Sequence, residues 1–238
     1  MALATLQLVI VVAGFAPTYY ARPATLPPLP PSFAWHGRVL TAWYLLVIVQ
    51  SGLIGLRRRE ATLRLHKRLG LLRLAGAVAA IYSGVGRAFE FYQSGSETEV
   101  LSPAGILTAN LMNLFGFAVC FSAGIAYRKN RELHKRYLTL AGVVMIGPAA
   151  FRLAVNCNLP PPVSLVVQLG LVGAMFAYDR LQLRRISTPN WVAVGLIARL
   201  IAQDMEQRGA TTARSDLVLR ARSALAEGSS ALLEAAGF

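Results

Sequence analysis

AGILTANLMNLFGFAVCFSAGIAY (residues 104–127) is an apolar run without a charged side chain. It is long enough to cross a bilayer as a helix, which takes about 20 residues. Similar blocks fill most of the chain, which is 55% hydrophobic and only 15% charged, against about 25% charged residues in soluble domains. The blocks are too long and too continuous for alternating barrel strands. The sequence therefore predicts an all-α, polytopic helical membrane bundle.

Six blocks are predicted to span the membrane, at residues 2–20, 37–56, 69–92, 104–127, 137–155 and 163–179. We interpret the first as a retained helix bent near Pro17, because no basic residue precedes it and no clear cleavage site follows it. The later stretch 190–205 is predicted to be interfacial, re-entrant or a partial seventh span, because Arg199 interrupts it. This gives a transmembrane domain at 1–186 and a cytoplasmic or interfacial extension at 187–238.

Basic residues alternate from one connection to the next and predict the orientation of the chain. The connections 57–68, 128–136 and 180–185 are rich in Lys and Arg, whereas 21–36, 93–103 and 156–162 contain only Arg22. The positive-inside rule then places both termini in the cytoplasm. Despite the net charge of +13, the basic residues form no patch interleaved with aromatic residues, so we predict contact with a bilayer, including its anionic lipids, and no nucleic-acid partner.

The motif LHKR occurs at 65–68 and again at 133–136, each time ahead of a predicted span on the cytoplasmic side. The spans 37–56 and 69–92 therefore match the spans 104–127 and 137–155. We predict two similar helical hairpins in the same orientation, as in other membrane proteins built from parallel repeats. A chance match of a short motif is the alternative.

The two motifs are also the leading candidate for a binding site. Cations beside the exposed backbone N–H groups of a helix N-terminus bind phosphates and carboxylates. The alternative is that Lys and Arg only set the topology while the histidines cap a helix or line an interface. The predicted ligand-binding residues are His66, Lys67, Arg68, His134, Lys135 and Arg136.

A haem or metal role is weighed against the supply of ligands. His66 and His134 are predicted on the same side of the membrane and could converge on a b-type haem, whereas His36 lies on the other side. No third histidine or cysteine accompanies them, so no metal site is predicted. Cys120 and Cys157 are predicted at different depths, which does not support a disulfide. No catalytic residue is identified.

Polar residues at similar depth in the outer half of several spans predict a second region of interest. Charged residues inside spans are costly and usually face the bundle interior. Alternatively, Arg87 and Glu90 neutralise each other on one helix face, and the asparagines only hold helices together. We predict an outer cavity or hydrogen-bonded plug formed by His36, Arg87, Glu90, Asn110, Asn113 and Arg152.

Four stretches resemble one known family. GFAPTYY (14–20), WHGRVLTAWYLLVIVQSGL (35–53), LHKRLG (65–70) and RELHKRYLTLAGVVMIGPAAFRL (131–153) are similar to a family of uncharacterised, multi-spanning bacterial inner-membrane proteins. The resemblance implies a bacterial inner-membrane location and no activity. A histidine that family members often carry after the YD step is missing from YDRLQLRRISTPNW (178–191), which counts against haem. LHKRLG also has a weak likeness to cytochrome-b-like and ferric-reductase-like membrane proteins, which use paired histidines within helices.

These observations predict an integral inner-membrane protein that binds a lipid-like or small anionic ligand. One alternative is an electron-transfer subunit with b-type haem or quinone. Another is a small-solute transporter, which the shortage of ionisable residues at mid-membrane disfavours. Within the span 37–56, Trp43 and Gln50 lie on nearly the same helix face and are predicted to pack between helices rather than to line a pocket.

Overall fold

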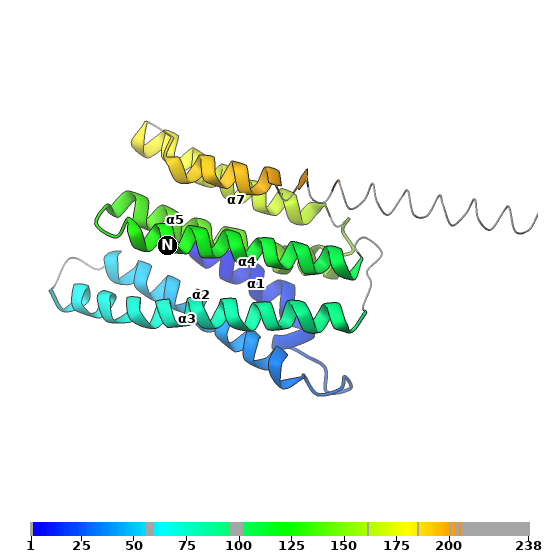
Figure 1. Cartoon of the computed structure of the whole chain (residues 1–238). Coiled ribbons are helices and arrows are strands. Elements are labelled where there is room, and N and C mark those ends of the chain that lie inside the picture. Colours follow the sequence, from blue (N-terminus) through cyan, green and yellow to red (C-terminus); the bar gives the residue numbers. More distant parts are fainter. Residues whose placement is uncertain are drawn as a thin grey trace, which may run out of the picture.

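The computed structural model describes residues 2–55, 60–95, 102–160, 162–184, 186–199, 201–202 and 205, and these form one helical bundle (Figure 1). A further helix covers 188–199. The named elements are α1 (Ala2–Phe15), η1 (Ala16–Tyr20), α2 (Pro31–Gly55), α3 (Glu60–Gln93), α4 (Pro103–Ala126), α5 (Arg131–Met145), α6 (Gly147–Asn156), α7 (Val163–Tyr178) and η2 (Asp179–Leu183).

The lengths and composition of these helices confirm the predicted fold class. Among the described residues, five helices are long and apolar enough to cross a membrane, and the bent pair of α5 and α6 makes a sixth. The part of the chain that the structure describes contains no strand. The predicted bend near Pro17 coincides with η1, a π-helical segment that continues α1. The protein is therefore an all-α membrane bundle.

Two hairpins form the centre of the bundle. Helix α2 packs along α3, and α4 packs along α5, while α3 and α4 join the two pairs. Figure 1 shows α3 and α4 side by side, with α1 behind them and α7 beyond α4. The pairing matches the two predicted hairpins. Their origin as a duplicated unit stays a prediction.

The span predicted as one helix at 137–155 is broken in the structure. Helices α5 and α6 meet at Ile146 with a bend of 44°. Pro148 lies in the first turn of α6, where it has no N–H to donate to the preceding turn and its ring displaces that turn's carbonyl. The prediction of a continuous helix was wrong because the sequence GP was read as part of an apolar run.

Small residues and single polar side chains hold α1 against its neighbours. A side chain at Gly14 would collide with the backbone carbonyl of Ala149, so α1 and α6 are in backbone contact there. Gln7 of α1 packs on Gly142 of α5, and the Tyr44 hydroxyl donates to the Gly142 carbonyl at 3.1 Å. Close approach at small residues is how membrane helices gain packing energy without a hydrophobic driving force.

The helix over 188–199 is an integral part of the packing, and the described residues 201, 202 and 205 beyond it are also helical. Ala193 and Ile197 belong to the buried core, and Trp191 packs edge-to-face on Phe176 of α7. In Figure 1 this orange segment runs beside α7. Residues 206–238 of the predicted extension lie outside the described residues, and the domain boundary at 186 stays a prediction.

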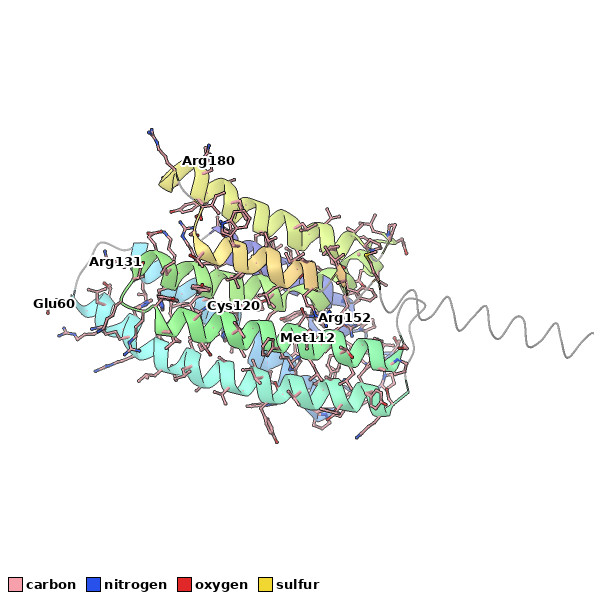
Figure 2. The ribbon with its side chains drawn as sticks, turned by 45° about the horizontal axis from the view of Figure 1, so that its top comes forward. Glu60, Met112, Cys120, Arg131, Arg152 and Arg180 are labelled. Atoms are coloured by element: carbon pink, nitrogen blue, oxygen red, sulfur yellow. The ribbon has the colours of Figure 1, made fainter. Side chains whose placement is uncertain are left out.

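Three connections that were predicted on one side of the membrane lie at one end of the bundle. Figure 2 places Glu60, Arg131 and Arg180 at this end and Arg152 in the opposite half. We call it the basic end. Arg57, Arg58 and Arg59 of the predicted positive cluster lie outside the described residues.

Candidate functional site

Both His-Lys-Arg motifs lie inside helices, which corrects the prediction that they form turns. His66 lies well within α3, which begins at Glu60, and His134 lies in the first turns of α5. The free N–H groups of α5 are already capped, because the Asn130 side chain accepts from Glu132 N and Leu133 N, both at 3.2 Å. Exposed helix N–H groups therefore do not contribute to an anion site at either motif. Acidic residues in the first turns balance the helix dipoles instead.

The cations of the second motif are neutralised by neighbouring side chains. Lys135 Nζ lies 3.0 Å from Glu132 and donates to the Tyr178 hydroxyl at 3.3 Å. Arg136 is almost fully buried and pairs with Glu132 at 3.3 Å and with Asp179, which is completely buried. This half of the predicted ligand set therefore joins α5 to α7 and η2.

Asp179 extends this ion pair to the final helix. Its Oδ2 accepts from the backbone N–H of Ser187 at 2.8 Å and from Asn190 Nδ2 at 2.9 Å. Ser187 lies immediately before the helix over 188–199, so the carboxylate fixes the start of that helix. Asp179 is absent from the predicted site, although an acidic residue at the end of a span is a recognisable signal.

The cations of the first motif, unlike those of the second, are not neutralised by described residues. Lys67 and Arg68 are exposed on α3, and no carboxylate or carbonyl partner is recorded for either of them within the described residues. His66 is half-buried, and its backbone carbonyl accepts from Gln50 Nε2 at 3.3 Å. The same residue pattern therefore gives one neutralised cluster and one cluster with two free positive charges.

The two histidines lie in different hairpins. His66 and His134 are close enough for their charges to interact. His134 Nδ1 is 2.7 Å from the carbonyl oxygen of Gly124, which directs the other ring nitrogen away from α4, whereas His66 Nδ1 is buried without a hydrogen-bond partner among the described residues. The two histidines that the sequence predicted on one side therefore lie within electrostatic range of each other.

Arg73 is the most unusual charged residue near this end and was not among the predicted site residues. It lies on α3 with only 6% of its surface exposed, and its guanidinium carbon is 4.9 Å from the Trp43 ring centroid and 5.9 Å from that of Phe121. Nη1 donates to Gln50 Oε1 at 3.3 Å. The signal that identifies it is a single arginine between leucines inside a predicted span. Arg73 packs against Trp43 and Gln50, which were predicted to pack between helices.

Part of the Arg73 guanidinium has no acceptor. Nε and Nη2 are buried and unpaired, and no carboxylate among the described residues forms an ion pair with Arg73. Burying an ion costs several kcal/mol, whereas a desolvated cation–π contact contributes about 2 kcal/mol and a hydrogen bond to a charged group about 1.5–3 kcal/mol. The observed contacts offset part of the cost and leave one edge able to bind an acceptor.

Three of the predicted outer residues, His36, Arg87 and Glu90, lie on α2 and α3. His36 Nδ1 lies 3.0 Å from Ser83 Oγ, and Arg87 pairs with Glu90 and stacks on Phe33 at 4.7 Å. An open groove of about 620 Å³ between α2 and α3 includes Arg87 and Glu90 in its lining, and none of the other four predicted residues. The predicted pairing of Arg87 with Glu90 on one helix face is what the structure has.

The remaining outer residues lie on α4 and α6, and Arg152 is within electrostatic range of Arg87. The amide groups of Asn113 and Gln168 both face Gly147, at the break between α5 and α6. Arg152 stacks on the Phe15 ring at 5.0 Å, and Asn110 is half-buried on α4. A single cavity shared by all six residues stays a prediction. Among the described residues no group of three metal-ligating side chains gathers.

Comparisons with known proteins give no match: no family model, no curated protein and no solved structure matches the chain. The resemblance to a bacterial inner-membrane family therefore stays a prediction that rests on its four sequence stretches. The chemistry of the site follows from its own side chains, above all from the free cations of α3 and the unpaired edge of Arg73.

Proposed function

We propose that this chain is a bacterial inner-membrane protein that binds a lipid-like or small anionic ligand at the basic end of α3. One observation carries the proposal: Lys67 and Arg68 are exposed and have no partner among the described residues, whereas the matching Lys135 and Arg136 are neutralised. Two adjacent free cations on a helix at the membrane boundary attract phosphate and carboxylate groups. His66 adds a polar ring beside them.

The orientation belongs to the same proposal. The basic end is cytoplasmic, because Lys and Arg accumulate in cytoplasmic connections. The inner leaflet of the membrane carries anionic lipids, and each Lys or Arg near such a surface contributes about 1 kcal/mol of attraction. Lys67 and Arg68 then face the leaflet where an anionic headgroup is most abundant.

Native mass spectrometry of the detergent-purified protein tests the proposal. Wild-type protein is titrated with phosphatidylglycerol and with zwitterionic phosphatidylcholine, and the same is done for Lys67→Gln with Arg68→Gln. We expect the wild type to prefer phosphatidylglycerol and the double variant to lose about thirtyfold in affinity, because two attractions of about 1 kcal/mol each are removed.

The matched control neutralises Arg128 and Lys129, which are also exposed and lie in the connection between α4 and α5. Arg128→Gln with Lys129→Gln removes the same charge from the same end of the bundle and should keep the preference. If both double variants lose the same affinity for phosphatidylglycerol, the loss reflects the net charge of this end of the bundle. That result would contradict a site on α3.

A b-type haem held by His66 and His134 is the second candidate, and one observation favours it. The Nδ1 of His134 is hydrogen-bonded to a backbone carbonyl, which is how ligating histidines are commonly oriented. An optical spectrum of the purified protein, oxidised and then reduced with dithionite, separates the candidates. A Soret band that disappears in His66→Ala would establish haem, and a featureless spectrum from folded protein would remove it.

A further inference from the structure

Arg73 lies deeper in the membrane than the free cations of the first motif. At 1.5 Å per residue it is about 20 Å along α3 from Glu60, within the half of this 34-residue helix nearer the basic end. Helical side chains lean toward the N-terminus of their helix, so its guanidinium reaches back toward His66. The residue therefore lies in the half of the bundle that adjoins the leaflet at the basic end.

The contacts of Arg73 leave a particular part of its guanidinium unused. Trp43 and Phe121 lie against it as aromatic rings, and Gln50 accepts from Nη1. The two unpaired nitrogens, Nε and Nη2, share one edge of the planar group, and their N–H bonds point in the same direction. That edge matches the spacing of two oxygens in a carboxylate or a phosphate, which arginine binds through parallel hydrogen bonds.

Two further buried polar atoms accompany this edge. Trp43 Nε1 belongs to the ring that contacts the guanidinium, and His66 Nδ1 is on the same helix toward the basic end; neither has a hydrogen-bond partner among the described residues. Buried donors are normally paired. The Trp43 indole N–H is an unpaired donor in the ring that contacts the guanidinium, and among the described residues no carboxylate pairs with that guanidinium. This combination favours an acceptor from outside the described part of the chain.

We propose that Arg73 anchors the oxyanion of a membrane-soluble ligand inside the bundle, through its Nε and Nη2. The oxyanion is the carboxylate of a fatty-acid-like molecule or the phosphate of a lipid headgroup, and its chain extends among the helices. This rests on the proposed function and deepens it. Lys67 and Arg68 attract the anion at the surface, and Arg73 holds it.

Equilibrium binding to delipidated full-length protein tests the proposal, with native mass spectrometry giving the stoichiometry. The probes are oleate, phosphatidylglycerol and oleyl alcohol, which has the chain of oleate without its oxyanion. We expect one oxyanion lipid per chain and no comparable binding of oleyl alcohol. Preference for oleate identifies a carboxylate ligand, and preference for phosphatidylglycerol identifies a lipid phosphate.

Two variants separate the contribution of the paired N–H donors of Arg73 from that of its positive charge. Arg73→Lys keeps the charge and loses the paired donors, and should weaken binding about tenfold; Arg73→Met removes both and should weaken it about a hundredfold. Thermal unfolding of each variant reports whether it is folded. If neither variant folds, the carbon-13 shift of carboxyl-labelled oleate on wild-type protein decides: a distinct bound signal supports the proposal, and its absence together with absent phosphatidylglycerol binding overturns it.

The outcomes distinguish this inference from the function on which it rests. Weaker binding in both Arg73 variants supports the interior anchor. Unchanged binding in folded Arg73→Met, with loss in the Lys67 and Arg68 double variant, overturns the anchor and leaves the surface site. A wild-type protein that binds neither oxyanion lipid overturns both.

Discussion

Arg73 and Arg136 are both arginines inside the bundle, and their partners give them opposite roles. Arg136 faces the buried carboxylate of Asp179, so its charge is matched by the chain and fixes helices to one another. Arg73 faces two aromatic rings and one amide, so its charge is only partly compensated. A charge matched within the chain stabilises the fold, whereas an incompletely matched one can bind a ligand.

Replacing Asp179 by Ala should destabilise the protein by about 3–5 kcal/mol, because it leaves the Arg136 charge buried without its partner. Ser187 and Asn190 would also lose their acceptor. The thermal unfolding midpoint in mild detergent measures the effect. Glu132→Gln is the control: Glu132 also pairs with Arg136 but is about half exposed, so less than about 1 kcal/mol should be lost. Equal losses would contradict a structural role specific to Asp179.

Helix boundaries change what each motif can do. Because α3 begins at Glu60, the first His-Lys-Arg motif has no free backbone N–H groups and acts through its side chains. The break at Gly147 and Pro148 turns α6 away from α5, and α6 then packs closely on α1. At Gly14 there is no room for a side chain between α1 and the Ala149 backbone.

Gly14→Ala should destabilise the bundle by about 1–3 kcal/mol, since its methyl group would collide with the Ala149 carbonyl, which cannot turn aside. Gly52→Ala is the matched control on α2, where an added methyl group meets nothing within 4 Å. It should be neutral or stabilise by up to about 1 kcal/mol, because Ala favours helix more than Gly. Thermal unfolding of the two variants, compared in the same detergent, measures both. A stable Gly14→Ala protein would contradict the backbone contact.

The whole molecule separates a basic end from an opposite half that contains Arg152 (Figure 2). The two cysteines differ in position and in exposure. Cys157 is exposed after α6, whereas Cys120 is fully buried in α4. They therefore provide a native pair of reporters, one for the orientation of the chain and one for the integrity of its core.

With the basic end in the cytoplasm, Cys157 faces the periplasm. A membrane-impermeant maleimide added to spheroplasts of a bacterial host should label the wild type at this cysteine and leave Cys120 unmodified. Cys157→Ser should remain unlabelled until the protein is denatured, when Cys120 becomes accessible. Labelling of Cys157 only after lysis would show the opposite orientation and contradict the proposed cytoplasmic position of Lys67 and Arg68.

The sequence predicted part of the candidate site. The sequence predicted that His66 and His134 share one side of the bundle, and in the structure they lie within electrostatic range of each other. It did not separate the two motifs, because neutralisation of Lys135 and Arg136 depends on Tyr178 and Asp179, which are distant in sequence. The sequence also did not identify Arg73. This residue stands out because it has one amide acceptor, Gln50, and no carboxylate partner among the described residues.

Apolar length and the distribution of basic residues determined the helical membrane class and the hairpin pairing, because the bilayer constrains segment length and connection charge locally along the chain. Only the tertiary structure showed that Asp179 neutralises Arg136 and that one edge of Arg73 is unpaired among the described residues. Only the tertiary structure showed the bend at Gly147 and the packing of the helix over 188–199 on the core. Whether a buried polar group is paired depends on contacts between helices that are far apart in sequence, and no local pattern records those contacts.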